Sequence, residues 1–223
     1  MKFEGGKPLD CIEQTDNLKY GKYGKYWLVS TFLSKSKKEF ISKLRKSMKR
    51  LTEEECKPGE ITAWEDCYDV LQRVLPKLPE SYRALWIIFE YVLPKKKPGT
   101  KKYCEGRYCR PDVILLSSDR VLVMEFKQSK GINPDAFARH VHQAGMYKRK
   151  LDKYHDASRH MTVLSILVLS KAENRREEQE DCIVCSPDQL ADEITHFMGN
   201  DPKPYINEIR WLQSTHSVVN EEN

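Results

Sequence analysis

The stretch RPDVILLSSDRVLVMEFKQSK, from Arg110 to Lys130, constrains the fold of this chain more than any other. It contains two apolar runs on either side of a short polar turn, which predicts a β-hairpin. Three charged residues, Asp112, Glu125 and Lys127, nevertheless lie within strands that otherwise have the composition of a buried core. The reason for their presence is the central question that the sequence raises.

The elements around the hairpin alternate between helical and strand-like patterns. Before the hairpin, in chain order, we expect a basic helix over about 37–51, a helix over 64–75 and a buried strand in RALWIIFEYVLP. After the hairpin we expect a helix capped by Asn133, a buried strand in MTVLSILVLS, a short strand in DCIVC and a last helix capped by Ser186. This order predicts an α/β fold with a central mixed β-sheet flanked by helices. We expect a core over 61–199, an N-terminal extension over 1–60 that carries the basic amphipathic helix, and a C-terminal tail over 200–223.

Length and composition allow one well-buried domain with additions. The 223 residues are 39% hydrophobic and 32% charged, as in a globular protein with a large solvated surface. No apolar run reaches the roughly 18 residues of a membrane span, and MKFEGGKPLD has no apolar segment typical of a secretory signal. Together with seven scattered cysteines, these features predict a cytoplasmic protein with reduced thiols.

The register of the hairpin brings its charged residues together. A tight turn at Ser118 and Asp119 pairs Ser117 with Arg120, and counting back places Asp112 opposite Glu125. Opposed carboxylates repel each other, and a divalent cation between them removes the conflict; oxygen ligands favour Mg²⁺ or Mn²⁺. Because side chains alternate along a strand, Lys127 lies on the same face as Glu125, where it would hold a phosphate oxygen or orient a water molecule.

Two clusters hold many of the positive charges, although the net charge is only +5. In KSKKEFISKLRKSMKR, Phe40, Leu44 and Met48 recur at helical spacing, so the lysines are interpreted as the solvated face of an amphipathic helix. The second cluster adjoins the charged hairpin, and there we expect contacts to nucleic-acid phosphates. Its residues are Lys95, Lys96, Lys97, Lys101, Lys102, Arg107 and Arg110.

The pattern Pro111-Asp112, followed across the hairpin by Glu125-Phe126-Lys127, resembles the PD-(D/E)xK nuclease superfamily. Gln143 and Tyr147 match the Q-x-x-x-Y motif of its RecB-like members, and the span from about 64 to 198 is similar to the nuclease-like domain ahead of the motor in some bacterial helicases. The chain has no phosphate-binding loop ending in Gly-Lys-Ser/Thr, so it is not predicted to be a motor itself.

The resemblance implies a restriction-endonuclease-like αβββαβ core and metal-dependent phosphodiester hydrolysis. It implies that Asp112, Glu125 and the Phe126 carbonyl bind the metal and that Lys127 positions or activates the water. For the remaining acidic ligand, Glu90 is preferred because a carboxylate within an apolar strand needs a charged partner, and Glu65 on the preceding helix is the second choice. Gln143 and Tyr147, one turn apart, would border the active site, whereas His140 is interpreted as structural.

Four cysteines offer a competing metal site. Cys104 and Cys109 lie in the basic loop, and Cys182 and Cys185 form a C-x-x-C pair. Alternation along a strand would direct the last two thiols to opposite faces, and the spacing departs from that of iron–sulfur nucleases. Buried reduced cysteines are therefore favoured over structural zinc or an iron–sulfur cluster.

The leading hypothesis is thus a Mg²⁺- or Mn²⁺-dependent nuclease, with DNA favoured over RNA by the resemblance alone. The alternative is a catalytically inactive, nuclease-like module that binds nucleic acid or recruits a partner. A helicase or another protein is the partner that the resemblance suggests. A basic scaffold for protein partners is a third reading, but it leaves the charged hairpin unexplained.

Overall fold

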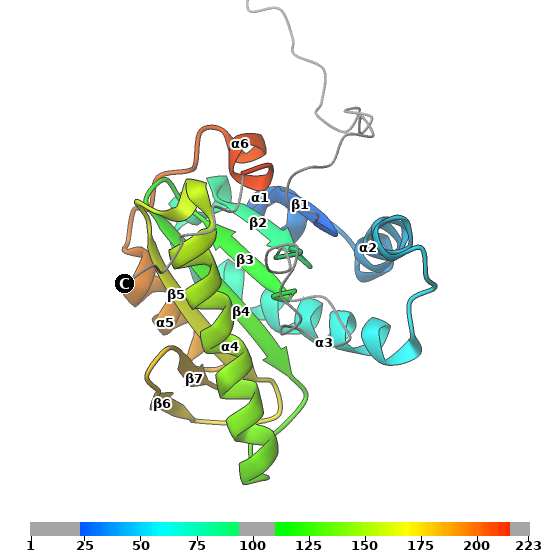
Figure 1. The fold of residues 1–223 in the computed structure, drawn as a ribbon, viewed down its shortest axis with the longest axis vertical. Coiled ribbons are helices and arrows are strands. Elements are labelled where there is room, and N and C mark those ends of the chain that lie inside the picture. The colour runs from blue at the N-terminus through cyan, green and yellow to red at the C-terminus, as the bar shows by residue number, and fades with distance from the viewer. Residues whose placement is uncertain (1–22, 94–109, 215–223) are drawn as a thin grey trace, which may run out of the picture.

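The computed structural model describes residues 23–93 and 110–214 (Figure 1). Its strands are β1 (Lys25–Leu28), β2 (Trp86–Phe89), β3 (Val113–Leu116), β4 (Arg120–Lys127), β5 (Thr162–Leu169), β6 (Arg176–Glu178) and β7 (Ile183–Cys185). Its α-helices are α1 (Val29–Leu33), α2 (Lys37–Thr52), α3 (Pro58–Val74), α4 (Pro134–Tyr154), α5 (Leu190–Met198) and α6 (Glu208–Leu212). Short 3₁₀ helices occupy Leu75–Lys77, Glu80–Ala84 and Asp156–Ser158. Within the described ranges, no helix has the length and apolar character needed to cross a membrane.

A mixed seven-stranded sheet forms the centre of the described structure, in the order β1-β2-β3-β4-β5-β7-β6. The first four strands pair antiparallel, whereas β4, β5 and β7 run parallel. Helix α4 makes the crossover between β4 and β5, as a parallel pair requires. The predicted α/β fold is confirmed, and the order α3, β2, β3, β4, α4, β5 is the αβββαβ order expected from the sequence.

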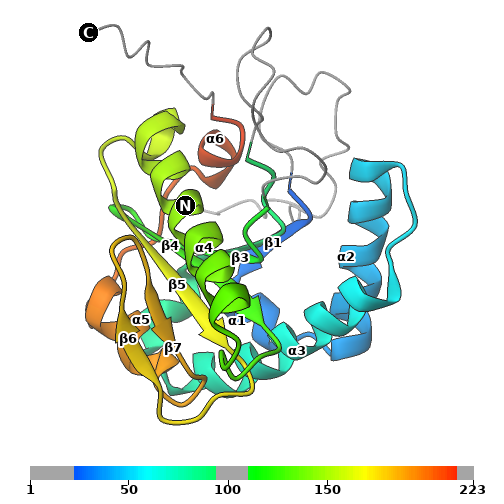
Figure 2. The same ribbon diagram turned by 60° about the horizontal axis from the view of Figure 1, so that its bottom comes forward.

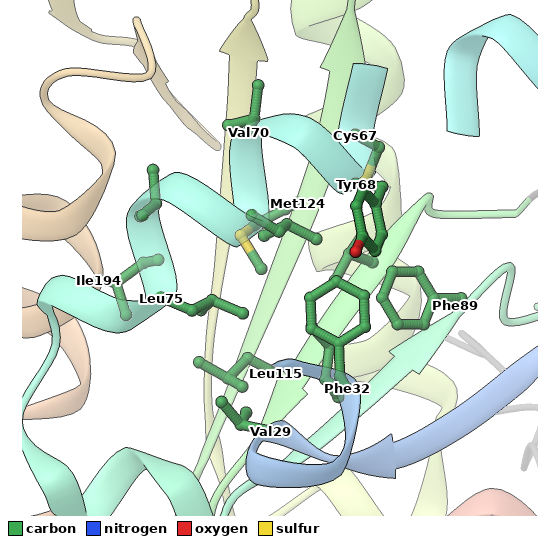
Figure 3. Packing of buried hydrophobic residues seen from close by; sticks show 14 of the residues in the cluster. Val29, Phe32, Cys67, Tyr68, Val70, Leu75, Phe89, Leu115, Met124 and Ile194 are labelled. Carbon is green, nitrogen blue, oxygen red and sulfur yellow. The ribbon is translucent and has the colours of Figure 1, made fainter. Parts of the chain in front are cut away.

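Helices cover both faces of the sheet, which explains why its strands are apolar on both sides (Figures 1 and 2). Side chains of α4 and α6, including Tyr147, Leu151 and Trp211, pack on one face. Helices α1, α2, α3 and α5 pack on the other face and form the largest hydrophobic cluster. Figure 3 shows part of this cluster, in which Phe32 and Tyr68 meet Phe89.

Several local predictions are confirmed. Ser117 N donates to Arg120 O over 3.0 Å, so the hairpin turns where the sequence predicted. Asn133 caps α4, with its side chain accepting a hydrogen bond from Ala136 N over 3.0 Å. The predicted cap at Ser186 is wrong: α5 begins at Leu190, and the Ser186 hydroxyl instead accepts a hydrogen bond from Arg175 N.

The strand predicted to run to Pro94 ends at Phe89. Glu90 has a φ of 54°, in the left-handed region that non-glycine residues seldom adopt. This conformation interrupts the strand, although Glu90 N still donates to Asp112 O over 3.0 Å. Glu90 is therefore not in mid-strand as predicted but at a bend beside the start of β3.

The predicted division at residue 60 does not separate two structural units. Strand β1 pairs with β2 in the central sheet, and Phe32, Phe40 and Leu44 belong to the same hydrophobic cluster as α3. The region predicted as a tail also joins the fold, because Trp211 and Leu212 of α6 are fully buried. The sequence did not reveal this integration because the contacts join segments far apart in the chain.

Candidate functional site

The carboxylates of Asp112 and Glu125 meet where β4 approaches its C-terminal end. Register pairs Val113 with Met124, and one further step along the ladder places Asp112 opposite Glu125, as predicted. Asp112 Oδ2 accepts a hydrogen bond of 2.7 Å from Phe126 N. In an extended strand the N–H and C=O of one residue point to the same side, so the Phe126 carbonyl is also directed toward Asp112.

Glu125 is the most completely enclosed of these acids, with 1% of its surface exposed. Its Oε1 accepts hydrogen bonds from Lys127 Nζ over 2.6 Å and from Gln143 Nε2 over 2.8 Å. Its Oε2 is buried and has no hydrogen-bond partner among the described residues. A buried oxygen without a partner is costly, so this atom is placed where a cation or a water molecule would stabilise the fold.

Burial and proximity alter the protonation of all three charged hairpin residues. Burial raises the pKa of Glu125 well above its usual range, and the nearby Asp112 charge raises it further. Burial also raises the pKa of Asp112, despite the opposing influence of Lys127 and of the Phe126 amide. For Lys127, burial acts against the charged form, but the charges of Glu125 and Asp112 outweigh it, so the pKa of the ammonium is raised. When both carboxyls are ionised, the site holds a surplus of negative charge that a bound cation would neutralise.

Helix α4 supplies the side chains that orient Glu125. The amide of Gln143 donates to Glu125 Oε1, and the same nitrogen donates to Tyr147 OH over 2.7 Å. Gln143 and Tyr147 are one helical turn apart, as their spacing predicted, and the Tyr147 side chain is buried. His140, one turn earlier, has its pKa lowered by burial and by the nearby cations Lys127 and Arg139.

Glu90 reaches the opposite side of the sheet from Gln143. Its Oε1 accepts a hydrogen bond from Trp64 Nε1 over 2.8 Å, and its Oε2 lies 3.3 Å from Arg110 Nε. Burial raises the pKa of Glu90 to about 7, although the Arg110 charge opposes the rise and Asp112 adds to it. Glu90 thus lies close enough to the Asp112 carboxylate to feel its charge, but its two oxygens already have protein partners.

Helix α3 contributes a face that the sequence analysis did not identify. Glu60, Trp64 and Cys67 recur at spacings of four and three, so they share one side of the helix. Glu60 Oε1 lies 3.2 Å from Arg110 Nη2, and its Oε2 accepts from Lys57 N over 2.9 Å. Burial, followed by the charges of Asp112 and Glu90, raises the pKa of the Cys67 thiol well above normal. The charge of Glu60, one turn before Trp64 on an otherwise apolar stripe, was the signal that could have identified this face.

Glu65, the second choice for a metal ligand, lies on a different side of α3. It lines a groove together with α2 residues such as Lys38 and Lys46. Arg110, predicted to bind phosphate, pairs with Glu90 and Glu60, and its side chain is 17% exposed. The other predicted phosphate-binding residues lie outside the described residues: Lys95, Lys96, Lys97, Lys101, Lys102 and Arg107.

The donor set fits a hard divalent cation in part. Over residues 23–93 and 110–214, no group of three or more His, Cys, Asp or Glu side chains has the geometry of a metal site. Mg²⁺, however, commonly binds one or two protein carboxylates and keeps water or substrate phosphate in its other positions. Asp112 and Glu125, with the Phe126 carbonyl, meet that smaller requirement, and the orphaned Oε2 of Glu125 fits such a role.

The described cysteines are arranged as alternation predicted. Cys182 packs with Ala144 and Leu167 on the α4 side, whereas Cys185 belongs to the cluster on the opposite face. The sheet separates the two thiols, so they would not bind one ion together. Cys104 and Cys109 fall outside the described residues.

The chain was compared with protein families, with curated proteins and with solved structures. None of the three comparisons finds a match. Function therefore has to be argued from the geometry of Asp112, Glu125 and Lys127 and from their surroundings.

Proposed function

We propose that this protein is a metal-dependent nuclease that hydrolyses phosphodiester bonds, with DNA as the favoured substrate. The observation that carries the proposal is the pairing of two carboxylates with raised pKa values, Asp112 and Glu125, beside the Lys127 ammonium. Ionisable groups perturbed by burial and by each other are typical of functional sites. The resemblance of the same residues to the PD-(D/E)xK pattern supports the proposal and is the reason for favouring DNA.

A divalent cation at this site would supply a water of lowered pKa and stabilise charge on the scissile phosphate. Asp112 and the free oxygen of Glu125 would hold that cation. Lys127 Nζ, now 2.6 Å from Glu125 Oε1, would orient the attacking water or bind a phosphate oxygen. Gln143 keeps Glu125 Oε1 in place, while Oε2 has no hydrogen-bond partner among the described residues.

A second candidate is a nuclease-like module that binds nucleic acid without cutting it. Two observations favour it: Arg110 and Trp64 occupy both oxygens of Glu90, and the described residues contain no three-ligand metal group. Such a protein would retain the sheet and the hairpin charges as structural ion pairs. The two candidates differ in whether a metal changes the covalent state of a bound nucleic acid.

Cleavage assays with linear duplex, circular and single-stranded DNA, and with RNA, in Mg²⁺, Mn²⁺ or EDTA, test the proposal. We expect metal-dependent cleavage that is lost in EDTA and in each of Asp112→Ala, Glu125→Ala and Lys127→Ala. A matched control is Lys77→Ala, because Lys77 is an exposed lysine outside the site. Full activity in any of the three site variants contradicts the assignment, and binding without cleavage under every condition supports the second candidate.

A further inference from the structure

We infer that the groove between α2 and α3 is a docking surface for a nucleic-acid backbone. The inference rests on the proposed function, since it names a surface along which the substrate would approach. The sequence alone favoured a solvated helix face for these lysines. The structure adds a concave shape and an imbalance of charge, on a helix whose buried side approaches the candidate site.

The groove is open and has a volume of about 800 Å³. Helix α2 forms one wall with the residues opposite its buried side, and α3 forms the other wall through Glu65. Helix α2 and the start of α3 lie on the side of the molecule away from β6 and β7 in both views (Figures 1 and 2). Its lining includes five cations, Lys37, Lys38, Arg45, Lys46 and Lys49, but only two acids, Glu55 and Glu65.

The protein's own acids leave part of this positive charge uncompensated. Glu55 pairs with both Arg45 and Lys49, and Asp69 pairs with Lys37 over 2.7 Å. Lys38 and Lys46 are exposed and have no acidic partner among the residues that the structure describes. Like charges three or four residues apart, such as Lys46 and Lys49, destabilise a helix, so the arrangement lowers the stability of α2. A polyanion bound in the groove would offset the repulsion between these cations and so stabilise α2.

The buried side of α2, behind this wall of the groove, approaches the candidate site. Arg110, which pairs with Glu90, also lies 4.0 Å from Met48 Sδ of α2. Leu44 of α2 and Glu90 both pack closely against Gly24. A Cβ atom added to Gly24 would lie 2.6 Å from Leu44 Cδ1 and 3.0 Å from Glu90 Cβ. The groove thus lies on the outer side of the same helix whose buried side approaches the candidate site.

A phosphate backbone suits this surface better than a compact anion does. The cations recur along several turns of α2, which a repeating charge matches. Long lysine side chains bind phosphates as mobile point charges without reading bases, so binding would not depend on sequence. Each contact would release about one condensed counterion, which makes the salt dependence of affinity a direct measure of occupancy.

The test is a titration of fluorescein-labelled duplex DNA in EDTA, so that no cleavage occurs, over a series of salt concentrations. The variant is Lys38→Gln with Lys46→Gln, and the control is Lys77→Gln with Lys153→Gln, which removes two other exposed lysines. We expect the groove variant to weaken binding and to reduce the slope of log affinity against log salt by about 1.8, or about 0.9 per lost contact. The control should keep the wild-type slope. Circular dichroism melts establish that all variants are folded. If the double variant unfolds, the single variants Lys38→Gln and Lys46→Gln replace it, and each is expected to reduce the slope by about 0.9.

An unchanged slope, or an equal fall in the control, overturns the inference. Displacement of the DNA by polyglutamate at equal charge concentration also overturns it and assigns the groove to an acidic peptide. The proposed function is judged separately by cleavage of the wild type in Mg²⁺ or Mn²⁺. If binding depends on the groove but no cleavage occurs, the nuclease proposal is wrong and the docking surface is supported. If cleavage occurs but the groove variant binds DNA as the wild type does, the nuclease proposal is supported and the docking surface is wrong.

Discussion

Gln143 on α4 donates hydrogen bonds from one amide nitrogen to both Glu125 Oε1, over 2.8 Å, and Tyr147 OH, over 2.7 Å. The amide has two N–H groups, and these contacts use both of them. Glu125 is consequently fixed through one oxygen, while the other is buried and has no partner within residues 23–93 and 110–214. This relationship links the Q-x-x-x-Y spacing of the sequence to a physical role, because it orients the carboxylate that the proposed metal would contact.

Gln143→Ala should weaken metal binding more than it weakens the fold. Residues that orient a metal ligand typically contribute about 10- to 100-fold to metal affinity or activity. We expect a shift of that size in the Mg²⁺ concentration needed for half-maximal cleavage, with activity recovered at high Mg²⁺. Tyr147→Phe is the matched control, because it removes the second partner of Gln143 and leaves the contact with Glu125. An unchanged Mg²⁺ requirement in Gln143→Ala contradicts the role.

The metal-free protein should lose stability as pH rises. Burial raises the pKa of Asp112 and Glu125 and brings that of Glu90 to about 7. A carboxyl has a pKa of about 4 in the unfolded chain. When folding raises that pKa, the carboxyl's contribution to the stability of the folded protein is fully present below about pH 4 and is lost as the pH rises through the folded-state pKa. Melting temperature in EDTA should therefore decline from about pH 4 through pH 7 on account of these groups.

Mg²⁺ should reverse this decline, because it binds the ionised carboxylates. The rise in melting temperature on adding Mg²⁺ should be larger at about pH 8 than at about pH 6. The double variant Asp112→Asn with Glu125→Gln should show a shallower decline in EDTA and no Mg²⁺-induced rise. A Mg²⁺ effect that is equal at both pH values, or retained in the double variant, would place the metal elsewhere.

Glu125→Gln should stabilise the metal-free protein while abolishing cleavage. The amide keeps the shape of the side chain, removes the repulsion with Asp112 and can donate to it. Lys127 is 24% exposed and can rehydrate its ammonium after losing the ion pair. We expect the free energy of unfolding in EDTA at neutral pH to rise by about 1 kcal/mol, as is common when a strained functional residue is replaced. Glu125→Ala, which leaves a cavity, should be less stable than Glu125→Gln in urea unfolding.

Arg110→Met should lower the free energy of unfolding by about 3 kcal/mol, because it leaves the buried Glu90 carboxylate without its cation. The double variant with Glu90→Gln should recover most of that loss, since Trp64 can still donate to the amide oxygen. Urea unfolding of the wild type, both single variants and the double variant forms a complete cycle. Additive effects of the two substitutions would show that the pair is not coupled.

Local chemistry determined much of the fold and half of the site. The Ser118-Asp119 turn and the alternation of side chains were sufficient to place Asp112 opposite Glu125, because a two-residue turn fixes the register of a hairpin. The Asn133 cap and the four-residue spacing of Gln143 and Tyr147 likewise depend on neighbours within one helix. Each of these features is decided by residues close in sequence, so the sequence by itself determined them.

Tertiary structure decided what depends on residues far apart. Nothing near Glu90 in sequence indicates that it adopts a left-handed conformation and reaches Trp64 and Arg110, since Trp64 lies on α3 and Arg110 lies just before β3. Strand β1 joins the sheet only because β2 offers it a free edge. Glu65 faces α2 rather than Asp112 because packing alone sets the rotation of α3, and the same packing creates the groove lined by Lys38 and Lys46. A helical pattern specifies which side chains share a face, but only the assembled core decides what that face meets.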